Sequence, residues 1–161
     1  MKNFNPIILT ILISILFPST IYADFQKGLD AAMNRDYVTA FKEWKPLADQ
    51  GDATPQFQLG WLYQEGLGVT QNYKTAINWY KQAAEQGYAY AQNALGRLYE
   101  NGQGVTQDFS RAYLWYTLAN LLWDPDAKVG QNRVSKKMNQ SQIEYAKKLA
   151  LSCLQKNYKG C

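Results

Sequence analysis

The chain has 161 residues, a formal net charge of +4 and no histidine. A chain of this length is expected to form one domain with a useful core. The lack of histidine removes the commonest general base and the commonest zinc ligand from any site the chain could build. We therefore expect no metal and no cofactor.

Residues 1–23 differ from the rest of the chain. Lys2 is their only charged residue, and a largely apolar run extends from Ile7 to Phe17. This layout is typical of a secretory signal peptide, with cleavage after Ala23. A membrane anchor needs about 20 apolar residues, and this run has only roughly 11. We predict a periplasmic or secreted protein without stable membrane insertion after cleavage.

The predicted export affects the expected chemical state of the two cysteines, Cys153 and Cys161. In an oxidising compartment an even number of cysteines favours a disulfide, which here would close a short loop at the C-terminus. Free thiols or an intermolecular bond are the alternatives. Neither cysteine lies in a metal-type CxxC motif.

An internal repeat is the main signal. Residues 51–86 and 87–122 align without gaps and are identical at 16 of 36 positions. Each unit divides into two predicted helices, which we call its A helix and its B helix. In the first of these units they cover about residues 54–65 and 73–86, and the next B helix covers about 109–122. A loop with two glycines separates A from B: Gly66 and Gly68, then Gly102 and Gly104.

An earlier unit occupies residues 24–50. Its B helix keeps the 36-residue spacing, but Gly28 precedes Gly60 by only 32 positions. The first A-to-B loop therefore lacks four residues, and about three units begin directly after the signal.

The repeat pattern fails after Leu122. Asp124 and Pro125 predict a helix to about residue 137, and Asn139 with Gln142 fits a capping box for a helix over about 140–157. We expect residues 123–161 to cap the stack, because the last unit has no neighbour to cover its apolar face.

Charge is unevenly distributed. Residues 24–126 carry a net charge of −4, whereas residues 127–161 carry +7. A basic end could meet nucleic acid or an anionic membrane surface. We expect a solvated outer face and no nucleic-acid partner, because an exported protein rarely meets nucleic acid.

Small residues recur in register and predict close helix crossings. The pairs are Ala53 and Ala89, Gly60 and Gly96, Ala76 and Ala112, and Ala83 and Ala119. Large aromatic residues fill the space between helices, and core packing is a better use for them than a ligand cage. They are Trp44, Tyr63, Trp79, Tyr80, Tyr99, Trp115 and Tyr116.

These motifs resemble Sel-1-like repeats, relatives of the tetratricopeptide repeats. The similarity rests on the AxxQxxLGxLY helix, the GxGV loop and the AxxWYxxAA helix at 36-residue spacing. It implies an all-α fold, a right-handed α/α superhelix of about three helix-turn-helix repeats with a C-terminal helical cap. It also implies an adaptor or binding scaffold in envelope assembly, signalling or host contact, with a protein or peptide as partner.

If the A helices line the inner curve, as the resemblance implies, one stripe of residues on them would face a partner. These positions vary between units while their neighbours do not, although neutral drift of solvated positions would give the same pattern. Trp61 is the strongest candidate, because an exposed Trp is a frequent binding hot spot; burial in the core is its alternative. The stripe consists of Gln58, Trp61, Glu65, Tyr90, Arg97 and Asn101, with Gln26, Leu29 and Met33 from the first unit.

We expect a monomeric binding protein rather than an enzyme. Some cysteine-rich members of the family are associated with penicillin binding and weak β-lactamase-like activity, but they carry spaced cysteine pairs within the repeats, which this chain lacks. It also has no GxSxG and no SxxK motif. A periplasmic inhibitor or immunity-type protein would also act by binding and is not distinguished from a scaffold.

Overall fold

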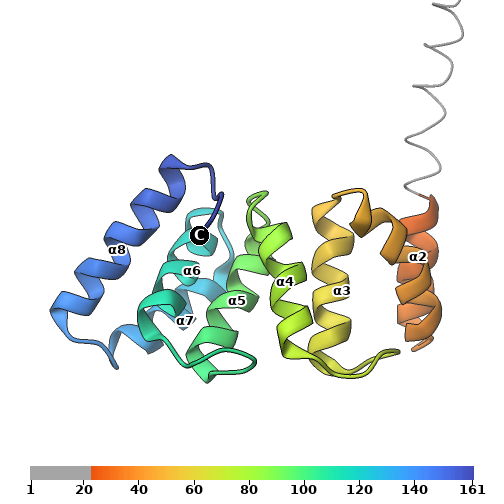
Figure 1. Cartoon of the computed structure of the whole chain (residues 1–161), viewed down its shortest axis with the longest axis horizontal. Helices are drawn as coiled ribbons and strands as arrows, with labels where there is room; N and C mark the ends of the chain where they lie inside the picture. Colours follow the sequence, from red (N-terminus) through yellow and green to blue (C-terminus); the bar gives the residue numbers. More distant parts are fainter. Residues whose placement is uncertain (1–22) are drawn as a thin grey trace, which may run out of the picture.

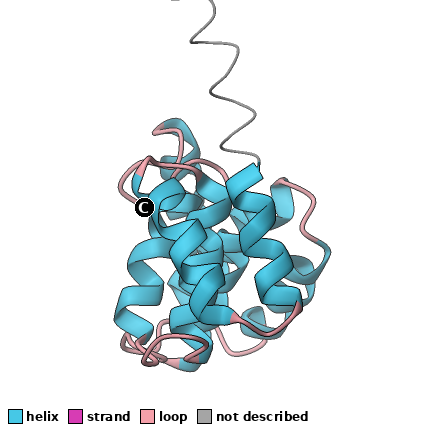
Figure 2. Cartoon of the chain, turned by 90° about the vertical axis from the view of Figure 1, so that its right-hand side faces the viewer, coloured by secondary structure: helices cyan, strands magenta, loops and turns pink. Residues whose placement is uncertain are grey.

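A computed structural model describes residues 23–161, in which every regular element is a helix (Figures 1 and 2). The first helix covers residues 23–33. It is followed by α2 (Tyr37–Asp49), α3 (Ala53–Glu65), α4 (Tyr73–Ala84), α5 (Ala89–Asn101), α6 (Phe109–Leu121), α7 (Pro125–Ser135) and α8 (Gln140–Gln155).

The helices form pairs that stack in a row, from the helix over residues 23–33 and α2 at one end to α5 and α6, and α7 and α8 cover the other end (Figure 1). Each A helix packs between two B helices: α3 contacts α2 and α4, and α5 contacts α4 and α6. At the last pair, α6 contacts both α7 and α8. The predicted all-α solenoid is confirmed.

An aromatic ring of each B helix lies directly on a glycine of its A helix. A Cβ atom at Gly60 would lie 2.5 Å from Cδ1 of Tyr80, and one at Gly96 would lie 2.7 Å from Cδ1 of Tyr116. Both rings are 1% exposed. Glycine costs roughly 1 kcal/mol of helix propensity relative to alanine, and the close approach of ring and backbone is the reason it recurs here.

The glycines of the A-to-B loop have separate roles. Gly66 ends α3 in the left-handed conformation, at φ 70°, and its N–H donates to the carbonyl of Leu62. Gly68 lies against the backbone of Tyr37, at the start of the preceding B helix, and Gly104 repeats this contact on Tyr73. The loop thus joins one unit to the unit before it. The first unit has no predecessor, which explains why it lacks these residues.

Several helices end earlier than predicted, at positions where the backbone turns. The helix predicted to end at residue 86 ends at Ala84, because the chain enters a turn that Gly87 completes with φ 80°. The helix predicted to end at 157 ends at Gln155, because Asn157 and Tyr158 both have positive φ. The capping box of α8 forms as expected between Asn139 and Gln142.

The 36-residue spacing extends beyond Leu122, where the sequence pattern stops. The N-cap of α7, Asp124, follows the N-cap of α5, Tyr88, at this spacing. Ala127 occupies the position of Ala91, and both are fully buried. The cap therefore begins with a helix that occupies the place of an A helix at the repeat spacing. Too few of its surface residues match those of α5 for sequence identity to reveal this.

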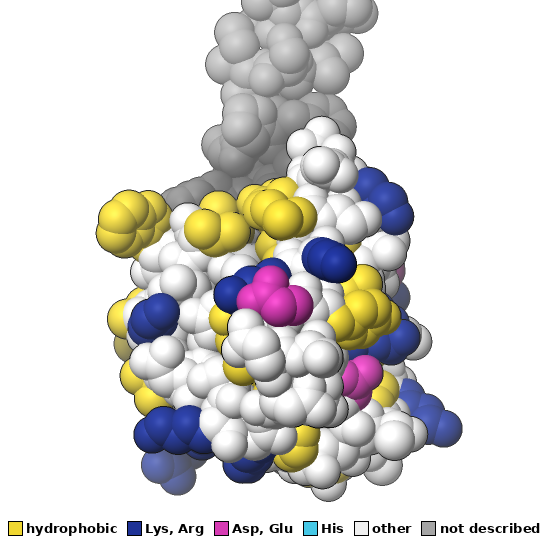
Figure 3. Space-filling model, turned by 90° about the vertical axis from the view of Figure 1, so that its left-hand side faces the viewer, with side chains coloured by type: hydrophobic (Ala, Val, Ile, Leu, Met, Phe, Trp, Pro, Cys, Tyr) yellow, Lys and Arg dark blue, Asp and Glu magenta, His cyan; other side chains and the backbone are white. Residues whose placement is uncertain are grey.

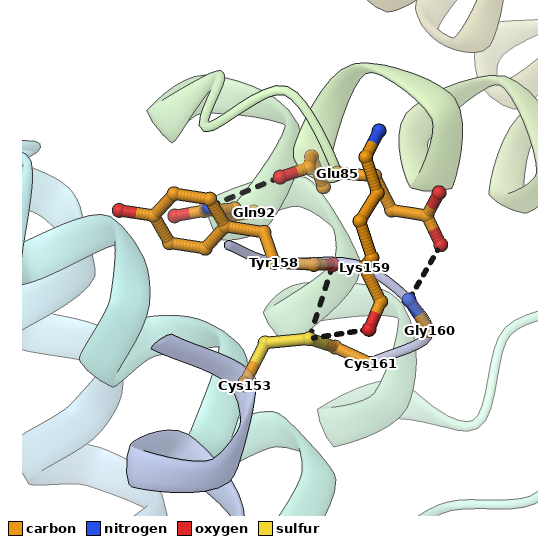
Figure 4. The surroundings of a disulfide bond; sticks show 8 residues. Glu85, Gln92, Cys153, Tyr158, Lys159, Gly160 and Cys161 are labelled. Atoms are coloured by element: carbon orange, nitrogen blue, oxygen red, sulfur yellow. Dashed lines mark hydrogen bonds between the residues drawn. A yellow bond between two sulfur atoms is a disulfide. The ribbon is translucent and has the colours of Figure 1, made fainter. Parts of the chain in front are cut away.

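The C-terminal tail folds back across the stack (Figure 4). Cys153 of α8 and the last residue, Cys161, form a disulfide with Cα atoms 5.6 Å apart. The N–H of Gly160 donates to Oε1 of Glu85 over 3.1 Å. The ring of Tyr158 lies beside Gly87. The tail thus links the cap to the turn between α4 and α5.

The predicted signal peptide, residues 1–23, lies outside the described residues except for Ala23. Between residues 23 and 161, none of the helices combines the length and the apolar character needed to span a bilayer.

Replacing Gly60 with alanine should destabilise the protein despite the better helix propensity of alanine. The new methyl group must displace the buried ring of Tyr80, and we expect a net loss of about 1–2 kcal/mol in the free energy of unfolding, measured by urea denaturation. In a Tyr80→Leu background the ring is absent, so the same change should cost little. An equal cost in both backgrounds would show that the ring is not the constraint.

Breaking the disulfide should loosen the cap. The double change Cys153→Ser and Cys161→Ser is expected to lower the free energy of unfolding by about 2–3 kcal/mol, because a closed loop restricts the unfolded chain. Peptide mapping of the non-reduced protein should recover Cys153 linked to Cys161. Recovery of two free thiols from protein exported to an oxidising compartment would contradict the bond.

Candidate functional site

The predicted stripe lies on one surface of the stack, which we call the A-face, formed by α3, α5 and α7. Gln58, Trp61 and Glu65 lie on α3, and the other three members lie on α5. Glu65, Tyr90, Arg97 and Asn101 are exposed, whereas Gln58 and Trp61 are half-buried. In the first unit Gln26 and Met33 are exposed and Leu29 is half-buried.

Two adjoining hollows form a continuous groove across the A-face. The first has a volume of about 220 Å³ and lies between α3 and α5. The second, of about 410 Å³, lies between α5 and α7. Asn93, Arg97 and Asp126 line both hollows, which makes them one A-face groove. Five of the six stripe residues line it; Gln58 does not.

The first hollow has an aromatic wall. Phe57 packs against Tyr80, Tyr88 and Tyr90 with ring centroids 5.4–6.1 Å apart. The ring of Tyr90 remains 59% exposed. Side chains of this kind bury a large area on binding at a small entropic cost, because they have few rotatable bonds.

Trp61 is not the freely exposed residue that the sequence suggested. Its ring packs edge-on against Tyr37 of α2 with centroids 5.8 Å apart, and it joins the hydrophobic cluster of the first two units. Its other side lines the groove. Trp61 therefore contributes to the core and to the groove together, because the start of α2 covers one of its faces.

The second hollow is built around a buried carboxylate. Glu100 is 5% exposed, and Arg133 of α7 donates to both of its oxygens over 2.7 Å. The hydroxyl of Tyr116 donates to Oε2 over 2.8 Å, and Nζ of Lys137 lies 3.8 Å from Oε1. These bonds join α5, α6 and α7 at one point.

The charge state of Glu100 follows from these contacts. The hydrogen bonds from the Arg133 guanidinium hold the pKa of the Glu100 carboxyl below its ordinary value of 4.5. Burial raises the pKa of Tyr116. At neutral pH the carboxylate is thus ionised and fully engaged, which suits a structural ion pair and not a proton donor.

Arg97 differs from Arg133 although the two are 36 positions apart. Arg133 is held by Glu100, whereas within residues 23–161 no carboxylate lies within ion-pair distance of Arg97. The residue equivalent to Glu100 in the preceding unit is Gln64, which accepts a hydrogen bond from Tyr80. Arg97 is therefore an exposed cation that is available to a partner.

Sequence reasoning missed Asn93, Glu100, Asp126 and Arg133, which also line the groove. The signal for Arg133 was present, since it follows Arg97 at the repeat spacing. Glu100 carried no such signal, because glutamine occupies its position in the unit before. Among the residues that the structure describes, no three potential metal ligands gather at one point. Aromatic, amide and charged side chains equip the groove for non-covalent recognition.

Replacing Arg133 with glutamine should lower the free energy of unfolding by about 2 kcal/mol at pH 7, because it leaves a buried carboxylate short of donors. Since the pKa of Glu100 is depressed on folding, the stabilisation exists above about pH 4.5 and is lost as the pH falls through the folded-state value. The difference between wild type and variant should therefore shrink between pH 7 and pH 3 in urea denaturation. Arg97→Gln is the matched control and should change stability little at either pH.

Comparisons with known proteins agree with this architecture. The Sel1 repeat model matches residues 56–88 and 89–122. Among solved structures, the chain is 27% identical to c5321, a protective antigen present in uropathogenic Escherichia coli strains that displays an SLR fold, with a TM-score of 0.80. It is 31% identical to a Sel1 repeat protein from Oxalobacter formigenes, with a TM-score of 0.66.

These alignments cover 86% and 70% of the chain but only 30% and 46% of those two proteins. A search of curated proteins finds no match. Stacked helical repeats of this kind are in general scaffolds for protein–protein interaction, because stacking creates an extended binding surface. The repeat matches and the shared fold identify the chain as a member of the Sel1-like repeat family.

Proposed function

We propose that the protein is an exported scaffold that binds an extended segment of a partner protein in the A-face groove. The observation that carries this proposal is the position of the variable residues. Five of the six stripe residues border one groove, which crosses three stacked helices.

The chemistry of the groove favours a segment with both apolar and acidic side chains. The wall formed by Phe57, Trp61 and Tyr90 suits an aromatic or aliphatic side chain. Arg97, between the two hollows, suits a carboxylate, because its planar fork can donate two parallel hydrogen bonds. The order of these features gives the groove a direction along the stack.

Export is supported by the sequence of the first 23 residues and by the disulfide of the cap. Disulfides persist in oxidising compartments, and the periplasm or the cell exterior would preserve this one. The partner would then be an envelope or extracellular protein, bound by a monomer of this chain.

A photo-crosslinking residue at position 90 in living cells should capture the partner, whose binding to the purified protein can then be measured by calorimetry. The double change Tyr90→Ala and Arg97→Glu should raise the Kd at least tenfold, because it removes an aromatic anchor and reverses a charge. Both side chains are exposed, so the melting temperature should stay nearly constant. Trp61→Ala is less useful, because the half-buried ring also supports the core.

The control variant is Lys148→Glu with Leu151→Ala on the outer side of α8, where both residues are exposed. It should bind the partner as the wild type does. If the groove variant also retains wild-type affinity, the partner binds elsewhere and the proposal is wrong.

A further inference from the structure

The turn between α6 and α7 departs from the repeat in a consistent way. The tripeptides at the ends of the B helices are Asp-Gln-Gly at 49–51, Glu-Gln-Gly at 85–87 and Leu-Leu-Trp at 121–123. Two acidic or polar residues and a glycine are thus replaced by three apolar residues at the same structural position. A single change could be drift, but three adjacent changes of one kind require a reason.

The backbone gives the first indication that this tripeptide is unfavourable for folding. Gly51 and Gly87 adopt φ 99° and 80°, and Trp123 is held at φ 66°. A bulky residue rarely adopts this left-handed conformation, in which its Cβ crowds the backbone. Strain of this kind is typically retained at functional sites.

A lost hydrogen bond gives the second indication. In the second unit, Nε2 of Gln86 donates to the buried Oε1 of Gln56 over 2.9 Å. The corresponding pair 36 residues later is Leu122 and Gln92, and leucine has no donor. Oε1 of Gln92 is accordingly buried without a hydrogen-bond partner. Because Leu122 has no donor, a buried hydrogen-bond acceptor of the third unit, Oε1 of Gln92, stays unpaired.

All three side chains remain exposed. Trp123 is 92% exposed, Leu121 53% and Leu122 36%. Among residues 23–161, Trp123 is the most exposed large hydrophobic residue. Their exposure, together with the strained backbone and the unpaired Gln92, makes them candidates for contact with a partner.

The tripeptide lies on the edge of the stack where B helices end and A helices begin, which is the upper edge in Figure 1. The C-terminal tail ends at this edge, with Lys156 and Lys159 exposed on it. Figure 3 shows hydrophobic side chains along the same edge at the α7–α8 end. The two carboxylates that follow Trp123 point away from this edge. Asp124 is buried as the N-cap of α7, and Asp126 lines the A-face groove.

We propose that this edge, consisting of Leu121, Leu122, Trp123, Lys156 and Lys159, binds the surface of a phospholipid bilayer that contains anionic lipid. Trp prefers the interface between headgroups and acyl chains, and lysines nearby are attracted to anionic headgroups. A stable interface between two folded proteins commonly takes about 20–30 residues a side, whereas a few inserted side chains suffice for reversible binding to a bilayer.

The sharpest test transplants the tripeptide of the second unit. In protein processed after Ala23, the triple change Leu121→Glu, Leu122→Gln and Trp123→Gly should reduce co-sedimentation with vesicles of 30% phosphatidylglycerol and 70% phosphatidylcholine at least tenfold. The same variant should melt at an equal or higher temperature, because it relieves the strain at residue 123 and supplies a donor for Gln92. Lost binding with undiminished stability excludes unfolding as the cause.

Two controls complete the experiment. Met33→Gln, which alters another highly exposed apolar residue at the opposite edge, should leave vesicle binding unchanged. Lys156→Gln with Lys159→Gln should weaken binding to the anionic vesicles. The fluorescence emission of the wild type should shift to shorter wavelength on binding, and this shift should be absent when Trp123 is replaced.

Three results would overturn the proposal. The wild type could fail to bind the anionic vesicles, or the triple variant could bind them as well as the wild type does. Alternatively, sedimentation velocity could show that the wild type self-associates through this edge and that the triple variant does not, which would make the edge a protein interface.

Discussion

The contact between an aromatic ring of each B helix and a glycine of its A helix sets the geometry on which the rest of the structure depends. At Gly60 beneath Tyr80 and at Gly96 beneath Tyr116, the ring occupies the space that a Cβ atom would need, so the B helix lies close to the backbone of its A helix. The spacing within each hairpin is thereby fixed, and so is the surface that it offers to the next hairpin. The A-face groove exists because three A helices are held at this spacing, with their outward residues free to vary.

Equivalent positions in successive units show how one framework acquires different functions. Gln64 accepts a hydrogen bond from Tyr80, and Glu100, 36 residues later, does the same from Tyr116. The negative charge of Glu100 also binds Arg133 and so attaches the cap. Arg97, with no such carboxylate beside it, stays available on the groove. A single change from amide to carboxylate therefore separates an arginine held in an ion pair from one that is exposed on the groove.

Two parts of the C-terminal end of the stack treat apolar side chains in opposite ways. The cap must cover the apolar side of the third unit, and α8, the disulfide and the tail do so by reaching back to the turn between α4 and α5, at Glu85 and Gly87. The turn at residues 121–123 instead leaves apolar side chains in solvent, at the expense of backbone strain and an unsatisfied glutamine. The same position in the other units holds Gly51 and Gly87, which adopt positive φ without this strain, and this contrast is the basis of the proposed binding role.

The sequence by itself determined the helices, their caps and the repeat, because these depend on local patterns: the apolar spacing, the loop glycines and the capping box of Asn139 and Gln142. It also placed five groove residues on one face, since helical periodicity fixes which side chains point together. Only the tertiary structure decided that Tyr37 covers half of Trp61 and that Arg133 reaches Glu100. The reason is physical: these contacts join different hairpins, and their geometry depends on how the hairpins pack, which no local pattern encodes.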